Sequence, residues 1–202
     1  SNNQEIIDRS NVIFLSVTPT VGNKILNELN FNNKKIIISL ISTIKLKKLK
    51  KLTKSKNICK AIPLPFIENL DGPIIISPKN KTAKRIFSKL GHVIEIKDEK
   101  MSYSFWSTSS VMAAYYEIYN STKNWLKQKG LKDRVATDYV AELFLALSKD
   151  AFVKKKIGYK KLVIESQTPK GLNMQVLKEL KKVRFYDKFK QSLENVHKRI
   201  KK

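Results

Sequence analysis

The first half of the chain alternates short β-branched runs with polar stretches of helical period. Strands are predicted at residues 12–17, 35–41, 58–62, 74–76 and 92–96. Helices are predicted between them, at residues 22–29, 45–52 and 82–90. Alternation of strands with helices predicts an α/β fold with a parallel, Rossmann-like sheet.

The second half of the chain changes to a helical period. Apolar positions predict helices over residues 103–129, from Asp133 onward, from Asn173 onward and over residues 185–200, with Asp133 and Asn173 as N-caps. These helices are more apolar than a single layer requires, which predicts burial against a partner subunit. We therefore expect two domains, residues 1–98 as a partial NAD(P)-binding Rossmann-like domain and residues 99–202 as an all-α dimerisation and substrate domain.

Two of the predicted strands end in proline-containing segments. Val17 leads into Thr18-Pro19, and Ile62 leads into Pro63-Leu64-Pro65. Proline donates no ladder hydrogen bond, so these segments cannot continue a central strand. They are expected to form loops at the carboxyl ends of strands, where open α/β sheets bind ligands.

The segment before the first strand contains no glycine. A dinucleotide-binding fold normally opens with a strand, a glycine-rich turn and a helix, in a unit of roughly 30 residues. Only residues 1–10 precede the strand here, and residue 1 is Ser. We therefore expect the chain to be a fragment, or a product that has lost its first βα units, and by itself to bind cofactor poorly and to be inactive.

The net charge of +24 raises the question of a nucleic-acid partner. Five of the 41 basic residues are arginines, although arginine is the side chain that base and phosphate recognition favours. The lysines are spread along the whole chain, and in residues 45–52 Leu46, Leu49 and Leu52 form an apolar stripe with lysines around it. A solvated lysine surface is favoured over a nucleic-acid site.

Composition also limits the metal, redox and membrane chemistry. Cys59 is the only cysteine and the histidines are His92 and His197, which argues against a zinc site and for a reducing, cytoplasmic environment. No apolar run reaches the roughly 18 residues that a membrane helix needs. Cys59 has no catalytic base nearby in sequence, and Asp98 and Glu99 fit a solvated turn.

Five segments stand in an order that can be compared with a known family. They are residues 3–19, 37–44, 61–65 (Ala-Ile-Pro-Leu-Pro), 108–115 (Thr-Ser-Ser-Val-Met-Ala-Ala-Tyr) and 167–173 (Gln-Thr-Pro-Lys-Gly-Leu-Asn). Together they resemble the pyrroline-5-carboxylate reductase family over essentially the whole chain. The last three stand where that family has Met-Pro-Asn, Ser-Gly-Ser-Gly-Pro-Ala-Tyr and Ser-Pro-Gly-Gly-Thr-Thr. The family's glycine-rich first unit has no counterpart here.

The resemblance implies a reductase that transfers hydride from NADP(H) or NAD(H) to a cyclic imine in proline biosynthesis, and a homodimer joined by the C-terminal helices. The implied cofactor-binding residues are Asn3 by the adenosine ribose or its phosphate, Ser16, Val17, Thr18 and Pro19 along the cleft, Leu40, Ile41 and Ser42 by the nicotinamide, and Pro63 at the same edge. The implied substrate-binding residues are Ser109 and Ser110, with the Gly171 N–H and the Asn173 side chain on the substrate carboxylate. No catalytic residue is implied by name.

The departures from the family pattern leave other interpretations open. Leu64 replaces an asparagine and Asn173 replaces a threonine, so a hydroxyl near the substrate is lost. Asparagine donates through its amide but is no general acid. Asn173 also fits a plain helix cap, and Ser109 and Ser110 fit close helix packing. A related imine or keto substrate, or a catalytically degenerate scaffold acting as a basic binding or dimerisation protein, remains the alternative.

Overall fold

The chain is represented by a computed structural model that describes residues 2–41 and 43–201. It divides into two compact units. The first extends to Ser109 and includes the end of the chain from His197, and the second covers Ser110–Val196.

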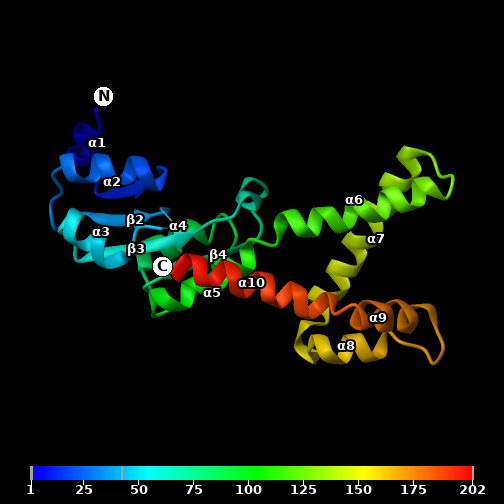
Figure 1. Cartoon of the computed structure of the whole chain (residues 1–202). Helices are drawn as coiled ribbons and strands as arrows, with labels where there is room; N and C mark the ends of the chain where they lie inside the picture. The colour runs from blue at the N-terminus through cyan, green and yellow to red at the C-terminus, as the bar shows by residue number, and fades with distance from the viewer. Residues whose placement is uncertain (1, 42, 202) are drawn as a thin grey trace. The chain divides into compact units, whose positions relative to one another are not determined.

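The first unit is an α/β layer structure (Figure 1). Its strands are β1 (Val12–Leu15), β2 (Ile36–Ser39), β3 (Asn57–Ile62), β4 (Pro73–Ser77) and β5 (His92–Glu95). Its helices are α1 (Asn3–Arg9), α2 (Pro19–Glu28), α3 (Leu46–Thr53), the 3-10 helix η1 (Pro65–Asn69), α4 (Lys81–Phe87) and α5 (Glu99–Ser109). The five predicted strands and the three helices predicted between them are confirmed, and α1 and η1 are additional.

The sheet is mixed rather than wholly parallel. Its strand order is β1-β2-β3-β4-β5, with β1, β2 and β3 parallel, β4 antiparallel to β3, and β5 parallel to β4. A parallel return needs a crossover of roughly a dozen residues or more, usually a helix. The connection between β3 and β4 contains only η1, so the chain turns back antiparallel. The predicted Rossmann-like α/β class is confirmed, but the expectation of a parallel sheet throughout is wrong at this connection.

Alternate residues of the strands build two apolar clusters, one on each face of the sheet. Ile37 and Ile58 join Leu26 of α2 and Leu49 of α3 in the first cluster. The second cluster is formed by the residues that alternate with them and by α4, and comprises Ile38, Cys59, Ala61, Ile74, Ile76, Ala83 and Phe87. Figure 1 shows α2 and α3 alongside β2 and β3. This two-sided burial explains why the central strands are apolar at nearly every position.

The second unit is helical. It consists of α6 (Met112–Gln128), α7 (Asp133–Val153), the 3-10 helix η2 (Lys155–Ile157), α8 (Tyr159–Glu165), α9 (Leu172–Lys182) and most of α10 (Phe185–Lys201), which ends in the first unit. The expected all-α second half is confirmed. The helix predicted over residues 103–129 is in fact two helices, α5 and α6. The expected division after residue 98 and the division after Ser109 differ by α5, because α5 packs on the sheet.

The two longest helices of this unit form a hairpin. Gly130 follows the C-cap of α6 with a φ of +94°, a conformation that glycine adopts without strain, and this agrees with the predicted helix end at residue 129. Tyr119 of α6 stacks on Phe144 of α7 with ring centroids 4.4 Å apart. Asp133 is the first residue of α7 rather than its N-cap, and its carboxylate pairs with Lys127 at 2.7 Å. In the part of the chain that the structure describes, every helix lacks the length or apolar character for crossing a membrane.

The sheet core gives a direct test of the fold. Ile37 is fully buried between α2 and α3, so Ile37→Ala is expected to lower the free energy of unfolding by about 2–5 kcal/mol through lost burial and a residual cavity. Ile6→Ala is the control, because Ile6 is 50% exposed and its loss should cost less than about 0.5 kcal/mol. Urea unfolding followed by circular dichroism measures both, and equal losses would contradict this packing.

Candidate functional site

The loops after the three parallel strands meet at one edge of the sheet. Leu40 follows β2, and its N–H donates to the carbonyl of Leu15, the last residue of β1, at 2.9 Å. Ser16 to Pro19 follow β1 at this edge, and Pro63 follows β3. The structure therefore brings together three of the predicted cofactor segments, at the place where open α/β sheets bind ligands.

The residues of this edge differ in what they can offer a ligand. Ser16 and Thr18 are exposed, and Val17, Pro19, Leu40 and Pro63 are partly buried. Ile41 is 1% exposed and packs against α2 where Gly22 lies, so it supports the loop from inside and does not present its side chain. Ser42, the last of the predicted nicotinamide contacts, lies outside the described residues.

Asn3 lies apart from this edge. It is the first residue of α1, and the neighbouring Gln4 exchanges hydrogen bonds with the backbone of Asn30 at 2.9 and 3.0 Å. Asn30 follows the C-terminal end of α2, whereas the carboxyl edge of the sheet meets the N-terminal end of that helix at Pro19. The predicted contact of Asn3 with the adenosine end stays a prediction.

The predicted substrate residues are divided between the two units. Ser109 ends α5 and its hydroxyl donates to the Phe105 carbonyl at 2.9 Å, while Ser110 opens the second unit. Gly171 and Asn173 stand where α9 begins. Gly171 and Asn173 thus lie together at one helix start. Substrate binding by these four residues stays a prediction.

The start of α9 is built differently from the sequence prediction. Gly171 is the N-cap and Asn173 is inside the first turn, so the prediction of Asn173 as the cap is wrong. The Asn173 amide donates back to the Ser166 carbonyl at 3.0 Å, and the Gly171 N–H donates to the Thr168 carbonyl at 2.8 Å. Gly171 has no room for a side chain because a Cβ would collide with the Thr168 hydroxyl. A carboxylate would therefore meet the N–H groups after Gly171, which open the helix.

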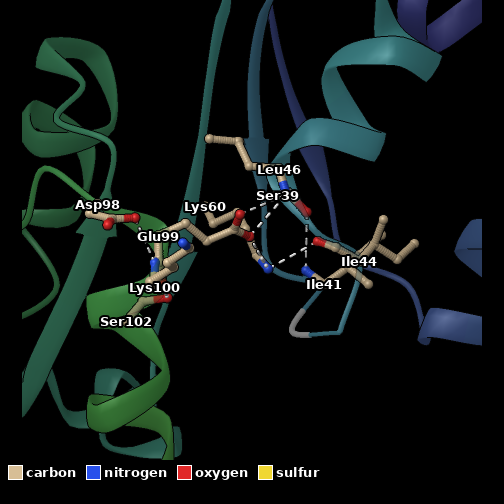
Figure 2. A network of polar contacts seen from close by, with 9 residues as sticks. All are labelled: Ser39, Ile41, Ile44, Leu46, Lys60, Asp98, Glu99, Lys100 and Ser102. Atoms are coloured by element: carbon tan, nitrogen blue, oxygen red, sulfur yellow. Dashed lines mark hydrogen bonds and ion pairs between the residues drawn. The ribbon is translucent and has the colours of Figure 1, made fainter. Parts of the chain in front are cut away.

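A buried polar row crosses the sheet on the face covered by α3 and α5. Ser39 of β2, Lys60 of β3 and Ser77 of β4 are register partners, and each is 2% exposed or less. The Lys60 ammonium donates to the Ile44 carbonyl at 3.0 Å and pairs with the Glu99 carboxylate at 3.1 Å (Figure 2). It also lies 4.4 Å from the centre of the Trp106 ring. These are interactions that a cation removed from water requires.

Glu99 is a central member of this network. Its two carboxylate oxygens accept the Leu46 N–H, at 2.9 and 3.0 Å, and one of them accepts from Lys60 (Figure 2). The Glu99 side chain is 15% exposed. The interpretation of Glu99 as part of a solvated turn is therefore wrong, while Asp98 opens α5 by accepting the Lys100 N–H at 2.9 Å.

Burial controls the acid–base properties of two neighbours on β3. Desolvation is the main cause that lowers the pKa of Lys60, and Glu99 opposes it through a hydrogen bond and its charge. Burial also raises the pKa of the Cys59 thiol to about 12. Cys59 is fully buried on the opposite face, in agreement with its predicted role as a core residue.

The network was missed from the sequence, although a signal was present. Lys60 interrupts the apolar strand Asn57–Ile62, and a lysine at a buried strand position needs a partner. The partner is 39 residues away, so no local pattern identifies it.

The carboxyl edge of β1, β2 and β3 offers groups for the nicotinamide of a dinucleotide but none of the usual groups for its pyrophosphate. The loops after β1, β2 and β3 offer partly buried and exposed groups that could border a nicotinamide. The six glycines of the chain are at positions 22, 72, 91, 130, 158 and 171, so no glycine-rich turn follows any strand, and the chain offers no such cradle for a pyrophosphate. Among the described residues, no group of three or more His, Cys, Asp and Glu side chains is arranged to hold a metal.

Comparisons with known proteins rest on structure. No family profile and no curated protein matches the sequence. Pyrroline-5-carboxylate reductase from Streptococcus pyogenes matches with a TM-score of 0.86 at 17% identity, over 98% of this chain and 78% of that one. The Plasmodium falciparum pyrroline carboxylate reductase with NADP bound matches with a TM-score of 0.86 at 23% identity, over 100% of this chain and 80% of that one.

A third structure agrees with these two. The pyrroline-5-carboxylate reductase of Coxiella burnetii matches with a TM-score of 0.81 at 20% identity, over 99% of this chain and 78% of that one. The chain therefore has the fold of pyrroline-5-carboxylate reductases, in the sheet unit and in the helical unit. The predicted fold class is confirmed.

The buried position of Cys59 predicts its reactivity. A thiol whose pKa is raised to about 12 holds almost no thiolate at pH 8, and the core excludes reagent. We expect Cys59 to resist an aromatic disulfide reagent in the native protein and to react within minutes in concentrated urea. Absorbance of the released thiolate measures both rates, and fast labelling of native protein would show that β3 is accessible.

Proposed function

We propose that this protein is an NAD(P)H-dependent reductase that acts on a cyclic imine carrying a carboxylate, as the pyrroline-5-carboxylate reductases do. The observation that carries the proposal is the extent of the structural match, which covers 98–100% of this chain in three such enzymes. The loops after β1, β2 and β3 carry the segments that the resemblance assigns to the cofactor. Fold alone does not fix chemistry, so the residues of the sheet edge and those of the α9 turn are each needed to support the proposal.

The cofactor would lie along the carboxyl edge of β1, β2 and β3. Ser16 and Thr18 would meet it from the first loop, Leu40 from the second and Pro63 from the third, with Ile41 supporting the second loop from inside. A bound reduced nicotinamide would supply the hydride that reduces the C=N carbon. The work left to this chain is to place the imine and exclude water.

The substrate carboxylate would bind where α9 begins. The N–H groups of the first helical turn have no partners within the helix, and the helix dipole favours an anion there. The Asn173 amide and the Thr168 carbonyl brace this turn through their bonds to Ser166 and Gly171. Ser109 and Ser110 would lie beside the imine ring, as the family motif implies.

We further propose that the helical unit pairs with a second copy of itself. In the second unit, only Ala136 and Val140 are fully buried apolar residues. Large apolar side chains are exposed along α7 at four-residue spacing, namely Val135 (53%), Tyr139 (58%), Leu143 (36%) and Leu147 (55%). A stripe of this kind marks an interaction surface rather than a solvent face. A homodimer through α7 and its neighbours would cover it.

The proposed function can be tested by fusing a glycine-rich strand–turn–helix unit to the chain. β1 is an edge of the sheet, so a parallel strand can pair with it. We expect the 202-residue chain to consume almost no NADPH with pyrroline-5-carboxylate, and we expect consumption once a glycine-rich strand–turn–helix unit is fused before Asn3. Absorbance of NADPH at fixed imine concentration measures the rate.

The fusion needs its own control. Fluorescence of NADPH on binding shows whether the added unit holds the cofactor. A fusion that binds NADPH but reduces neither pyrroline-5-carboxylate nor other cyclic imines would contradict the proposed function and favour the catalytically degenerate scaffold.

The homodimer has a separate prediction. The double variant Tyr139→Glu with Leu147→Glu places two charges in the exposed stripe and is expected to sediment as a monomer, while the unchanged chain sediments with twice the mass of one chain. Arg134→Glu with Lys149→Glu is the matched control, because it adds two glutamates on exposed polar positions of the same helix. A monomeric unchanged chain at micromolar concentration would refute the dimer.

A further inference from the structure

The segment between β2 and α3 connects the proposed nicotinamide border to a helix. Its described residues are 40, 41 and 43–45. Ile41 and Ile44 lie in the apolar cluster beneath α2 and are 1% and 3% exposed. Apolar packing thus holds two side chains of the segment, but it leaves the backbone groups at its far end to be fixed by polar partners.

The helix that follows the segment is capped from a distance. Lys45 occupies the N-cap position of α3 and makes no capping hydrogen bond with its side chain. The Leu46 N–H donates instead to both oxygens of Glu99, which is 53 residues away. A carboxylate is favoured at this place because it satisfies an N–H of the first turn and faces the positive end of the helix dipole.

The partner of Glu99 fixes a second backbone group of the same connection. Lys60 donates to the Ile44 carbonyl at 3.0 Å, and its ammonium is 3.1 Å from Glu99. One ion pair therefore determines the position of the Ile44 C=O and the Leu46 N–H together (Figure 2). The Lys60 and Glu99 side chains are 3% and 15% exposed. Buried pairs contribute little net stability because desolvation offsets their attraction, so geometry is the stronger explanation for this one.

We propose that Lys60 and Glu99 are positioning residues that set the backbone position of Ile44 and Leu46 and, through them, the nicotinamide border at Leu40 and Ile41. The second half of this statement rests on the proposed function. Neither side chain needs to touch the cofactor. Their effect is transmitted through the Ile44 carbonyl and the first turn of α3.

The test uses four variants of Lys60 and Glu99 and one control variant at a different ion pair of the same unit. Glu99→Ala removes the cap and the counter-charge, and Glu99→Gln keeps an acceptor for Leu46 but removes the charge. Lys60→Met removes the bond to Ile44, whereas Lys60→Arg keeps a charge and several donors. The control is Glu95→Ala, since Glu95 pairs with Lys84 at 2.9 Å between α4 and β5.

The first measurement is backbone hydrogen exchange of residues 43–46 in the 202-residue chain. Glu99→Ala is expected to raise the exchange rate of the Leu46 amide by roughly tenfold to a hundredfold, because its hydrogen-bond partner is lost. Lys60→Met is expected to loosen the same residues, and Lys60→Arg to restore most of the protection. Glu95→Ala should leave them unchanged. Unchanged exchange in Glu99→Ala, or equal loosening in Glu95→Ala, would overturn the proposal.

The second measurement uses the fusion protein with the added glycine-rich unit. Glu99→Ala and Lys60→Met are expected to lower the maximal rate by about tenfold or more while the KM for the imine changes by less than about threefold, since the substrate contacts are elsewhere. Lys60→Arg should recover most of the rate. An unaltered rate despite loosened exchange would overturn the link to the nicotinamide border. A fusion that binds NADPH but turns over no imine would refute the proposed function, and the exchange comparison would still decide whether the pair positions the segment.

Discussion

A cation buried in the middle of a sheet imposes a strict requirement on everything around it. Lys60 is 2% exposed on the third of five strands, and its charge is tolerable only with a counter-charge and hydrogen-bond acceptors at close range. Glu99 supplies the counter-charge from the first residue of α5 and at the same time accepts the first N–H of α3. The start of α5 and the start of α3 are therefore tied to one point of β3. This is why α5 belongs to the sheet unit although its sequence continues the helical period of the second half.

The two units reach stability by different means. The sheet unit buries apolar residues on both faces of the sheet, as in Ile37 on one side and Ile38 on the other. The helical unit buries few, and its α7 exposes Tyr139 and Leu147 by more than half. Apolar side chains that stay exposed to water contribute no hydrophobic stabilisation, so a helix hairpin with this surface gains less free energy from folding alone than from folding with a partner. The proposed homodimer through the helices would cover this exposed surface and would account for the difference in burial between the two units.

Local sequence patterns predicted most helices and strands. The features that they missed depend on contacts between residues far apart in the sequence. The β-branched runs located all five strands, because central strands buried on both faces are apolar at nearly every position. The direction of β4 was missed, since it depends on the connection between β3 and β4 being too short for a crossover. The break at Ser110 and Val111 between α5 and α6 was also missed, because the apolar period passes through it without interruption. At the site, the loops after β1 and β3 were predicted from their prolines and the loop after β2 from the family resemblance. Glu99 has no local signal because its partners are in β3 and α3.

Under the proposed function, the departures from the reductase family motifs would have a milder consequence than in an acid–base enzyme. Leu64 replaces an asparagine, and Asn173 lacks the hydroxyl of a threonine, which would be severe losses if those groups transferred protons. In a reductase the reactive atom belongs to the nicotinamide, and the protein contributes orientation and electrostatics. Asn173 still braces the first turn of α9 through Ser166, and Leu64 still leads from β3 into η1. Positional tasks of this kind tolerate a change of functional group as long as the backbone keeps its course. Under the proposed function, activity would therefore depend most on the backbone, in the sheet unit near Ile44 and Leu46, which Lys60 and Glu99 bind, and in the helical unit at Gly171.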